Sequence, residues 1–441
     1  MENTVPPKIQ IPHFIEHARQ GTYYTIPFSM PEGTETFSLS YQYERHHTGQ
    51  VVLEPGSFTS RQQANVIDLG LIAPDGSQVG VSGSNKSSIF ISETRATPGY
   101  HPCKLVAGEW QILVGAYKVA GQGVDVRYEL TFTPKHLRWL KGDLHTHTFA
   151  SDGVFSLDEL ARHAFRNGLD YLAITDHNQM PSAEVLLQYP DITLIRGMEW
   201  THFRGHANFL GADGSYSEPF FANTLEEIRR RFESAHAHGA LIVINHPRDG
   251  LNPFEFDLEG LPFDCLEIWK GLILEYNPIA IAWWQNMLVA GKKVPVCGGS
   301  DYHEDSLNRF PGGPTTCVYA MSNSPADILS ALKAGHAFVT YAPYGPMLEL
   351  TAGEAIMGDS VPLSRTNRVE VTARGLNTGD VVQVITAQGS TPLVKAESGG
   401  DFQGEYRVEK PGFARVEILR SFLPRLPMLP VLVSNPIYFD G

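Results

Sequence analysis

The segment 141–148, with the sequence Lys-Gly-Asp-Leu-His-Thr-His-Thr, constrains the fold more than any other stretch of the chain. We interpret it as a strand whose end carries two histidines, His145 and His147, two residues apart. Alternate side chains of a strand point to the same side, so both imidazoles face one place. Asp152 follows in a Ser-Asp-Gly turn, and a Ser-x-x-Glu capping box at 156–159 predicts a helix that ends near residue 167. We therefore expect a strand, a polar loop and a helix, in this order.

Strands and helices alternate from about residue 142 to residue 341. Short β-rich runs are separated by runs with a helical pattern, an order typical of parallel strands in a barrel or a doubly wound sheet. The expected fold class of the middle of the chain is therefore α/β. The predicted strands lie at 170–175, 192–195, 240–244, 265–269, 294–296 and 316–319, and the predicted helices include 225–238 and 325–334.

The two flanking regions are β-rich. Short β-rich segments separated by turns with proline and glycine are typical of a β-sandwich. We predict three domains: a β-sandwich at 1–138, an α/β barrel at 139–342 and a second, smaller β-sandwich at 343–441. For the flanking domains, a packing role is favoured over a carbohydrate- or partner-binding role, because no constellation of ligand-binding side chains stands out in them.

Composition narrows the class of protein and its partners. Of the 441 residues, 42% are hydrophobic and 19% are charged, so we expect an ordered globular protein. A net charge of −14 argues against binding to a nucleic-acid backbone or an anionic membrane surface. No secretory signal pattern begins the sequence, no apolar run is long enough to span a bilayer, and the four cysteines lie far apart. These features predict a cytoplasmic location, buried thiols, and neither a membrane nor a nucleic-acid partner.

Histidines and carboxylates recur just past the predicted strands of the middle region. The carboxyl ends of the strands form the active face of α/β barrels, so these side chains can converge. Imidazoles and carboxylates without thiolates suit Zn²⁺, Mn²⁺ or Fe²⁺, and nine ligands suit two or three such ions. Asp143 and Asp176 stand beside ligands and either orient them or serve an ordinary turn. The nine predicted ligands are His145, His147, Asp152, His177, Glu199, His206, His246, Asp301 and His303.

The order of these motifs resembles that of the PHP (polymerase and histidinol phosphatase) metallohydrolases. The chain is most similar to their carbaryl-hydrolase-like branch, over about residues 142–341. Lys270 stands where an asparagine is expected in that branch, a difference that bears on the substrate class. The matching motifs lie at 143–147, 151–153, 174–178, 197–199, 205–206, 245–247 and 299–303.

This resemblance implies a distorted seven-stranded β/α barrel with a multinuclear metal centre. It also implies how the ligands are divided among two or three divalent ions. One ion is held by His145, His147, Glu199 and Asp301, a second by Glu199, His206 and His246, and a third, where present, by Asp152, His177 and His303.

The expected reaction is hydrolysis by a hydroxide that bridges two metal ions, since a bound zinc ion lowers the pKa of water to about 7. We favour a phosphoesterase that acts on a small, anionic phosphomonoester or phosphodiester. Arg204, Arg248 and Lys270 lie near the ligand loops and are candidates to hold the phosphoryl oxygens. His202 and His303 are candidates to protonate the leaving group. For each of these residues, a solvated side chain is the competing interpretation.

Two other functions stay open. The same metal centre could attack carbon, as a carbamate, amide or ester hydrolase whose apolar pocket is lined by tryptophans such as Trp200 and Trp269. The metals could instead be structural, in a carbohydrate- or partner-binding protein. Nine ligands with a shared Glu199 argue against closed sites of four ligands each. No sequence pattern indicates the oligomeric state.

Overall fold

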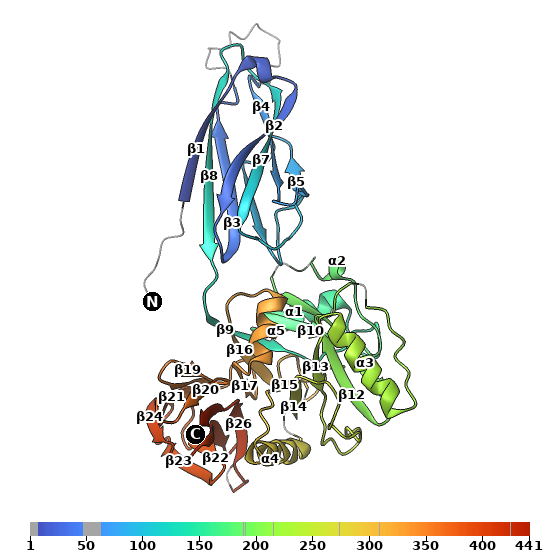
Figure 1. Ribbon diagram of the computed structural model, residues 1–441, viewed down its shortest axis with the longest axis vertical. Helices are drawn as coiled ribbons and strands as arrows, with labels where there is room; N and C mark the ends of the chain where they lie inside the picture. The colour runs from blue at the N-terminus through green and yellow to red at the C-terminus, as the bar shows by residue number, and fades with distance from the viewer. Residues whose placement is uncertain are drawn as a thin grey trace. The chain divides into compact units, whose positions relative to one another are not determined.

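Two units make up the computed structural model, Met1–His136 and Leu137–Gly441 (Figure 1). The structure describes residues 8–46, 63–187, 189, 191–214, 216–272, 274–307, 309–423 and 425–441. As expected, both units are rich in strands, and the helices lie in the second unit apart from one short 3-10 segment, η1 (His17–Arg19).

Two antiparallel sheets share one hydrophobic core in the first unit. Burial alternates along the strands: in β8, Val126, Tyr128 and Leu130 are buried, whereas Asp125 and Arg127 are exposed. This period of two places one face of each sheet against the other, which is the arrangement of a β-sandwich. One sheet has the order β1 (Lys8–Ile15), β8 (Val124–Pro134), β3 (Thr34–Tyr43), β6 (Ser88–Ser92), and the other β2 (Thr22–Met30), β7 (Gly108–Lys118), β4 (Val66–Ile72), β5 (Gln78–Ser82).

A mixed sheet forms the middle of the second unit. Its strands β9, β10 and β11 are parallel, as are β13, β14 and β15. Most of the predicted ligands lie at or just past the carboxyl ends of these two parallel sets, whereas Glu199 lies inside β11 and His206 lies near the start of the next strand. The order across the sheet is β15 (Val296–Gly299), β14 (Cys265–Lys270), β13 (Leu241–Ile244), β12 (Gly205–Leu210), β11 (Thr193–His202), β10 (Tyr171–Ile174), β9 (Arg138–Asp143), β16 (Thr315–Ala320), β17 (Ala337–Thr340).

The sequence did not predict strand β12, and the expectation of parallel strands throughout was wrong. β12 is antiparallel to both β11 and β13. Only Phe203 and Arg204 lie between β11 and β12. Two residues can close a hairpin but cannot form the crossover that parallel neighbours need. β16 is likewise antiparallel to β9 and to β17.

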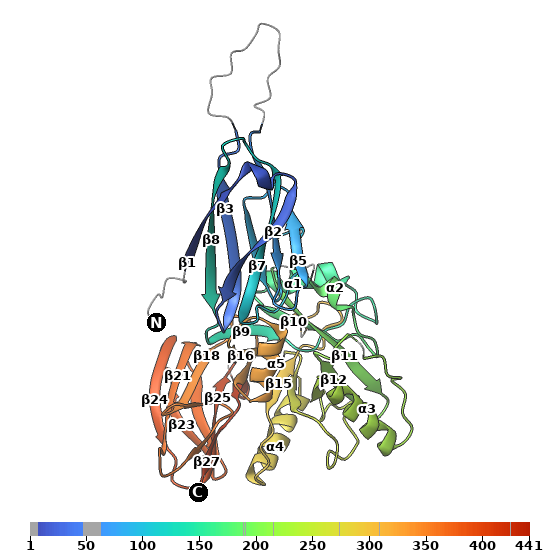
Figure 2. The same cartoon turned by 45° about the horizontal axis from the view of Figure 1, so that its top comes forward.

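Helices lie between some of these strands along the chain (Figure 2). The predicted capping box is present: Ser156 and Glu159 bond reciprocally at the start of α1 (Leu157–Arg166). α3 (Leu225–Ala237) packs on β13, α4 (Tyr276–Val289) on β14 and α5 (Pro325–Lys333) on β16, while α2 (Ala183–Leu186) is a single turn beside β11.

β15 is the end of the hydrogen-bonded path. Side-chain bonds nevertheless bring it next to β16: Gly298 N donates to Thr316 Oγ1 at 2.9 Å, and this hydroxyl donates to Gly298 O at 2.7 Å. Among the described residues, backbone ladders do not close the circle, so the seven-stranded barrel stays a prediction.

The C-terminal strands continue the central sheet, because β17 pairs with β26. Asn435 reinforces this junction: its side-chain amide donates to Val296 O and Ala337 O at 3.0 and 2.9 Å. Both parts thus lie in one unit, and a separate domain that begins at 343 stays a prediction. The strands are β18 (Met347–Ala352), β19 (Ala355–Ile356), β20 (Ser360–Pro362), β21 (Arg368–Leu376), β22 (Val381–Thr386), β23 (Gly389–Lys395), β24 (Gly400–Arg407), β25 (Gly412–Arg420), β26 (Leu429–Ser434) and β27 (Ile437–Asp440).

The helices of the described part of the chain are all too short or too polar to cross a membrane. Cys265, Cys297 and Cys317 are buried free thiols, and Cys103 is partly buried.

Candidate metal centre

The two histidines of the first motif are buried just beyond β9, which ends at Asp143, so the prediction that the strand itself carries them was wrong. The side chains of His145 and His147 have no exposed surface. Asp143 holds this strand end against that of β15, since its carboxylate accepts bonds from the backbone N–H groups of His145, Ser300 and Gly312 at 3.2, 3.0 and 2.8 Å. Burial raises the pKa of Asp143 to about 6, although these bonds favour its charged form. Of the two roles left open for Asp143, these contacts fit the orienting one.

All nine predicted ligands come together in the structure. They form overlapping groups in which one donor atom of each residue lies within 4.8 Å of the others. The groups link residues up to 156 positions apart in the chain, so only the tertiary fold could assemble them. The groups are His145, His147, Glu199 and Asp301; Glu199, His206 and His246; His147, Asp152, His177 and His303; and, in addition, His145, His246 and Glu267.

Glu199 lies at the centre of the cluster and is fully buried. Its Oε1 atom lies 3.2 Å from His145 Nε2 and 3.1 Å from His206 Nδ1. Its Oε2 atom lies 3.5 Å from His147 Nε2 and 2.9 Å from His177 Nδ1. The two oxygens therefore face different groups of histidines, which is the geometry that a shared ligand needs.

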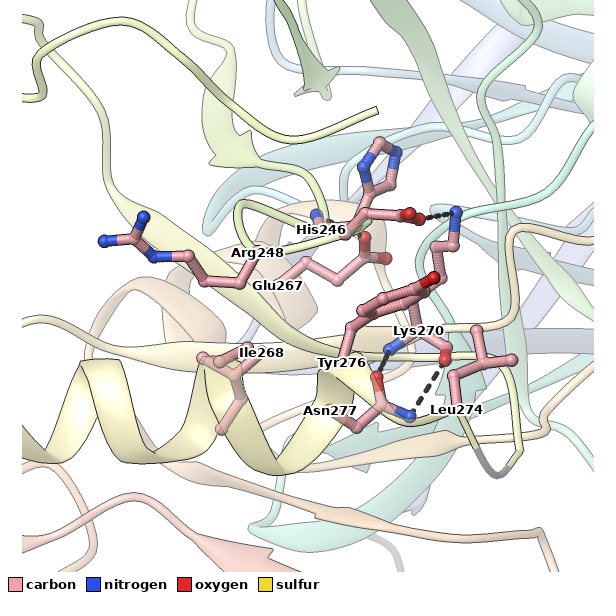
Figure 3. A pocket seen from close by; sticks show the side chains of 10 residues that line it. His246, Arg248, Glu267, Ile268, Lys270, Leu274, Tyr276 and Asn277 are labelled. Carbon is pink, nitrogen blue, oxygen red and sulfur yellow. Dashed lines mark hydrogen bonds and ion pairs between the residues drawn. The ribbon is translucent and has the colours of Figure 1, made fainter. Parts of the chain in front are cut away.

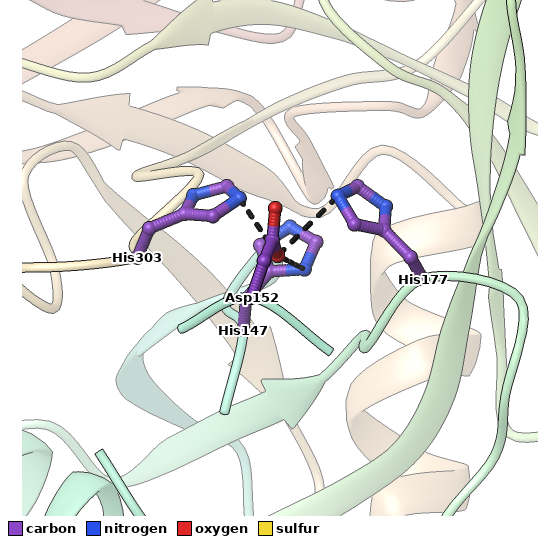
Figure 4. Close-up of side chains that lie close together, drawn as sticks. All are labelled: His147, Asp152, His177 and His303. Atoms are coloured by element: carbon purple, nitrogen blue, oxygen red, sulfur yellow. Dashed lines mark ion pairs between the residues drawn. The ribbon is translucent and has the colours of Figure 1, made fainter. Parts of the chain in front are cut away.

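Asp152 forms the solvent side of the cluster, with 55% of its side chain exposed. Its Oδ1 atom lies 3.3 Å from His303 Nε2, 3.5 Å from His177 Nε2 and 4.0 Å from His147 Nδ1. Figure 4 shows the three imidazoles around this carboxylate. The cluster is thus buried at Glu199 and open at Asp152, so a small molecule has access from this side.

Three buried atoms at the centre have no hydrogen-bond partner: His145 Nε2, His147 Nε2 and Glu199 Oε2. Leaving such atoms unpaired costs about 1–3 kcal/mol each. The two imidazole atoms lie 3.2 to 3.5 Å from carboxylate oxygens of Glu199 and Asp301, which is the spacing of two atoms that each lie about 2.0–2.2 Å from a common ion. The imidazole and carboxylate donors, together with these unpaired atoms, fit divalent metal ions.

Two carboxyls of the cluster favour the charged form. Burial opposes the charge of Glu199 and of Asp301, but His145 and further neighbours together outweigh it, and the pKa of each carboxyl lies well below its usual range. A buried cluster of anionic carboxylates and imidazoles is suited to a cation.

Backbone conformation also marks this site. His246 and Asp301, directly beyond β13 and near the end of β15, have φ angles of 29° and 50°, and Asn178 has a φ angle of 54°. Such values are uncommon for residues with a Cβ and cost about 1–3 kcal/mol. Of the four non-glycine residues with positive φ among those described, three lie here. Strain of this kind clusters at functional sites, because it aims side chains that a regular strand end would not.

Among the predicted catalytic cations, only Lys270 reaches the cluster. Its Nζ atom lies 2.5 Å from Asp249 Oδ2 and 3.2 Å from Asp301 Oδ2. Burial disfavours the ammonium charge, but Asp301 and Asp249 outweigh it and raise the pKa of Lys270. By contrast, the guanidinium of Arg248 lies 4.5 Å over the ring of Trp283, and Figure 3 shows it extending away from Lys270.

The predicted residues Arg204 and His202 lie on the β11–β12 turn, beside a separate cavity of about 280 Å³. Arg204 pairs with Glu255 at 3.2 Å and lies over the ring of Phe256. His202 Nε2 lies 3.1 Å from Ala222 O, and its Nδ1 accepts a bond from the backbone N–H of Arg204. His303, the other candidate acid, does lie in the cluster, with Nδ1 placed 2.9 Å from Asp301 O. His202 therefore has both nitrogens engaged away from the cluster, whereas His303 Nε2 faces it.

Sequence reasoning missed two residues that contact the ligands and one that contacts Lys270. Glu267 contacts His145, Asn245 Nδ2 donates to Glu199 Oε1 at 2.8 Å, and Asp249 pairs with Lys270. A signal existed for Glu267, because it is an acidic residue flanked by Leu266 and Ile268 inside a buried strand. A buried acid in such a strand needs a partner, and the partner proves to be a ligand.

Comparisons with known proteins agree with this geometry. Residues 143–249 match the sequence profile of the PHP domain. The chain is 43% identical over 60 residues to the DNA polymerase/3'-5' exonuclease PolX of Bacillus subtilis, a match that covers 14% of this chain and 10% of that protein. It is 33% identical over 148 residues to a "Probable phosphatase" of Vibrio campbellii, which covers 27% of this chain and 56% of that protein. The chain thus spans about a tenth to about half of the length of these curated relatives.

Among solved structures, the chain is similar to a two-domain protein from Bacteroides vulgatus, described as containing a predicted PHP-like metal-dependent phosphoesterase. The TM-score is 0.40 at 17% identity, and the match covers 68% of this chain and 95% of that chain. The expected resemblance to PHP proteins is confirmed by the profile match over residues 143–249, which hold the predicted ligands from His145 to His246.

Proposed function

We propose that this chain is a metal-dependent hydrolase that cleaves small phosphoesters. The observation that carries this proposal is the convergence of nine imidazole and carboxylate side chains around buried atoms that have no hydrogen-bond partner. Relatives with the names phosphatase and exonuclease support the choice of phosphoesters. The seven-stranded barrel, the kinship with the carbaryl-hydrolase-like branch and the cytoplasmic location belong to this proposal as well.

Two or three divalent ions, of zinc, manganese or iron, would be held by the ligand groups. His145, His147, Glu199 and Asp301 would hold one ion; Glu199, His206 and His246 a second; and Asp152, His177 and His303 a third. When bound, such ions supply Lewis acidity, which lowers the pKa of water and offsets charge on a phosphoryl group.

The chain's own side chains would bind and protonate the substrate. Lys270 provides a buried ammonium next to Asp301, close enough to the cluster to hold a phosphoryl oxygen. When only two ions are bound, His303 is free of metal and partly exposed beside Asp152, so its Nε2 atom can give a proton to a leaving group that departs toward solvent. A third ion held by His303 would exclude this role. Arg204 and Arg248 lie on aromatic rings instead, so their assignment to phosphate binding would require both side chains to move.

The scarcity of cations favours one further candidate, attack on carbon. A carbamate, amide or ester substrate carries less negative charge than a phosphoester, so its binding needs fewer cationic side chains. The predicted tryptophan pocket does not support this alternative, because Trp200 Nε1 donates to Phe220 O and Trp269 Nε1 to Leu272 O, both in packed surroundings. We therefore keep phosphoesters as the first choice.

Rates on metal-loaded protein test the reaction class. The substrates are p-nitrophenyl phosphate, bis(p-nitrophenyl) phosphate and an aryl carbamate with the same leaving group, with and without a chelator. We expect a phosphoester to react fastest, and chelation or the double change His145→Ala with His147→Ala to abolish turnover. A carbamate preference would replace the proposal by attack on carbon.

The expectation that nucleic acid is not a substrate needs its own test, since one relative is named as an exonuclease. A labelled single-stranded oligonucleotide incubated with the metal-loaded protein should stay intact under conditions that exhaust the small phosphoester. Trimming from either end would instead place this chain with the nucleases.

A further inference from the structure

Strand β14 contains a β-bulge that directs two charged side chains toward the metal cluster. Glu267 pairs with Cys297 of β15 and Trp269 with Gly298, so Ile268 is one extra residue. In a regular strand, residues three positions apart face opposite sides. The bulge reverses this relation, and both Glu267 and Lys270 contact ligands. Bulges next to active sites often redirect side chains in this way.

Glu267 uses both carboxylate oxygens on ligands from different groups. Its Oε1 atom lies 3.0 Å from His145 Nδ1, and its Oε2 atom accepts a bond from the backbone N–H of His246 at 2.9 Å. Its side chain is 2% exposed, so water does not replace these partners. Figure 3 shows Glu267 beneath His246.

Because Gly299 of β15 has no side chain, it leaves room for the side chains of Glu267 and His145. A Cβ atom on this residue would lie 2.5 Å from Glu267 Oε1 and 2.4 Å from His145 Cβ, closer than real Cβ atoms approach other atoms. The position opposite Lys270 therefore has to be glycine if Glu267 and His145 are to meet.

We infer that Glu267 is a positioning residue that fixes both His145 and His246 for metal binding. This inference rests on the proposed function, because it takes the cluster to bind metal. A carboxylate that accepts the Nδ1–H proton of His145 leaves the lone pair on Nε2, the atom that faces Glu199 and Asp301. The same carboxylate holds the His246 backbone in its unusual conformation, with φ at 29°. One side chain thus links the two deep ligand groups.

The change Glu267→Gln tests this role, since glutamine has the same shape but only one acceptor oxygen. It cannot accept from both His145 and His246. If its amide instead donates to His145 Nδ1, the proton moves to Nε2 and removes the lone pair that a metal needs. We expect zinc affinity, measured by competition with a chelator, to fall about 10- to 100-fold.

Glu417→Gln is the matched control. Glu417 is also a buried carboxylate, 8% exposed, but it pairs with Arg415 in the C-terminal strands. The zinc affinity of the Glu417→Gln variant should equal that of the wild-type protein. The melting temperature of each metal-free variant separates a positioning role of Glu267 from a purely structural one. If the role is purely structural, Glu267→Gln lowers the melting temperature and leaves the zinc affinity of the folded protein unchanged.

Equal zinc affinities of the wild-type protein and folded Glu267→Gln would overturn the inference and leave the proposed function intact. A wild-type protein without affinity for divalent ions would overturn both. If Glu267→Gln does not fold, Glu267→Asp serves in its place: it keeps the charge but is one methylene too short for both contacts. We expect it also to weaken zinc binding, and unchanged affinity would again overturn the inference.

Discussion

Replacing Asp143 by asparagine should loosen the strand ends that carry the ligands, without removing a ligand. The Asp143 carboxylate accepts three backbone N–H bonds, from His145, Ser300 and Gly312. An asparagine oxygen can keep the first two, which share Oδ1, but its NH₂ group then faces the N–H of Gly312. One hydrogen bond to a charged group, worth about 1.5–3 kcal/mol, is lost.

Part of the free energy of this hydrogen bond is offset in the native protein, because burial raises the pKa of Asp143 to about 6 and so disfavours the charge of its carboxylate. We therefore expect a local loss at the lower end, of about 2 kcal/mol, which corresponds to about 30-fold faster exchange of the affected amide. Hydrogen exchange followed by mass spectrometry on peptides that cover 143–149 and 298–313 measures this directly.

Asp170→Asn is the matched control for this experiment. Asp170 is exposed and accepts a single bond, from the backbone N–H of Lys141 at 2.8 Å. Its replacement should change exchange in the same peptides by no more than about threefold. Equally small changes in Asp143→Asn would refute the reasoning that this carboxylate holds the two strand ends together.

Three further outcomes are expected. Lys270→Met should lower kcat/KM for an anionic phosphoester by about 10-fold or more and spare a neutral carbamate, as steady-state kinetics would show, since the ammonium next to Asp301 is lost. Gly299→Ala should weaken zinc binding in chelator competition, because its Cβ would displace Glu267 and His145, and unchanged affinity would contradict the close packing of this position against them. Asp264→Asn should lower the urea midpoint at pH 7. Burial opposes the charge of Asp264, but partners that include Lys333 outweigh it and depress the pKa of this carboxyl in the folded protein. The charged carboxylate therefore stabilises the fold above the pKa that it has in the unfolded chain, and this stabilisation is lost as the pH falls through the depressed pKa. If the urea midpoints of the wild-type protein and Asp264→Asn differ by the same amount at pH 7 and at pH 3, the charge of Asp264 does not stabilise the fold.

Local patterns in the sequence were enough to locate the candidate ligands. The two-residue spacing of His145 and His147 predicted that both imidazoles face one place, which they do although β9 ends at Asp143. The capping box at 156–159 begins α1 where expected. Both depend on neighbours within a few positions. The match of residues 143–249 to the PHP domain confirms the family resemblance that rested on these motifs.

Other features were beyond local patterns, since they depend on contacts between distant segments. Arg204 and Arg248 stand next to ligands in the sequence but lie over aromatic rings, because Phe256 and Trp283 offer apolar surface for their side chains. Glu267 looked like one residue of a buried strand, and only the bulge and the absence of a Cβ on Gly299 bring it to His145.

The sequence by itself therefore determined which residue types stand at the strand ends and that they suit divalent ions. The tertiary structure alone decided which of their neighbours face the cluster. Strand periodicity and helix capping act between residues close in the chain and can be recognised there. The direction of a long or buried side chain is set by packing and charge in three dimensions, where β14, β15 and β9 meet.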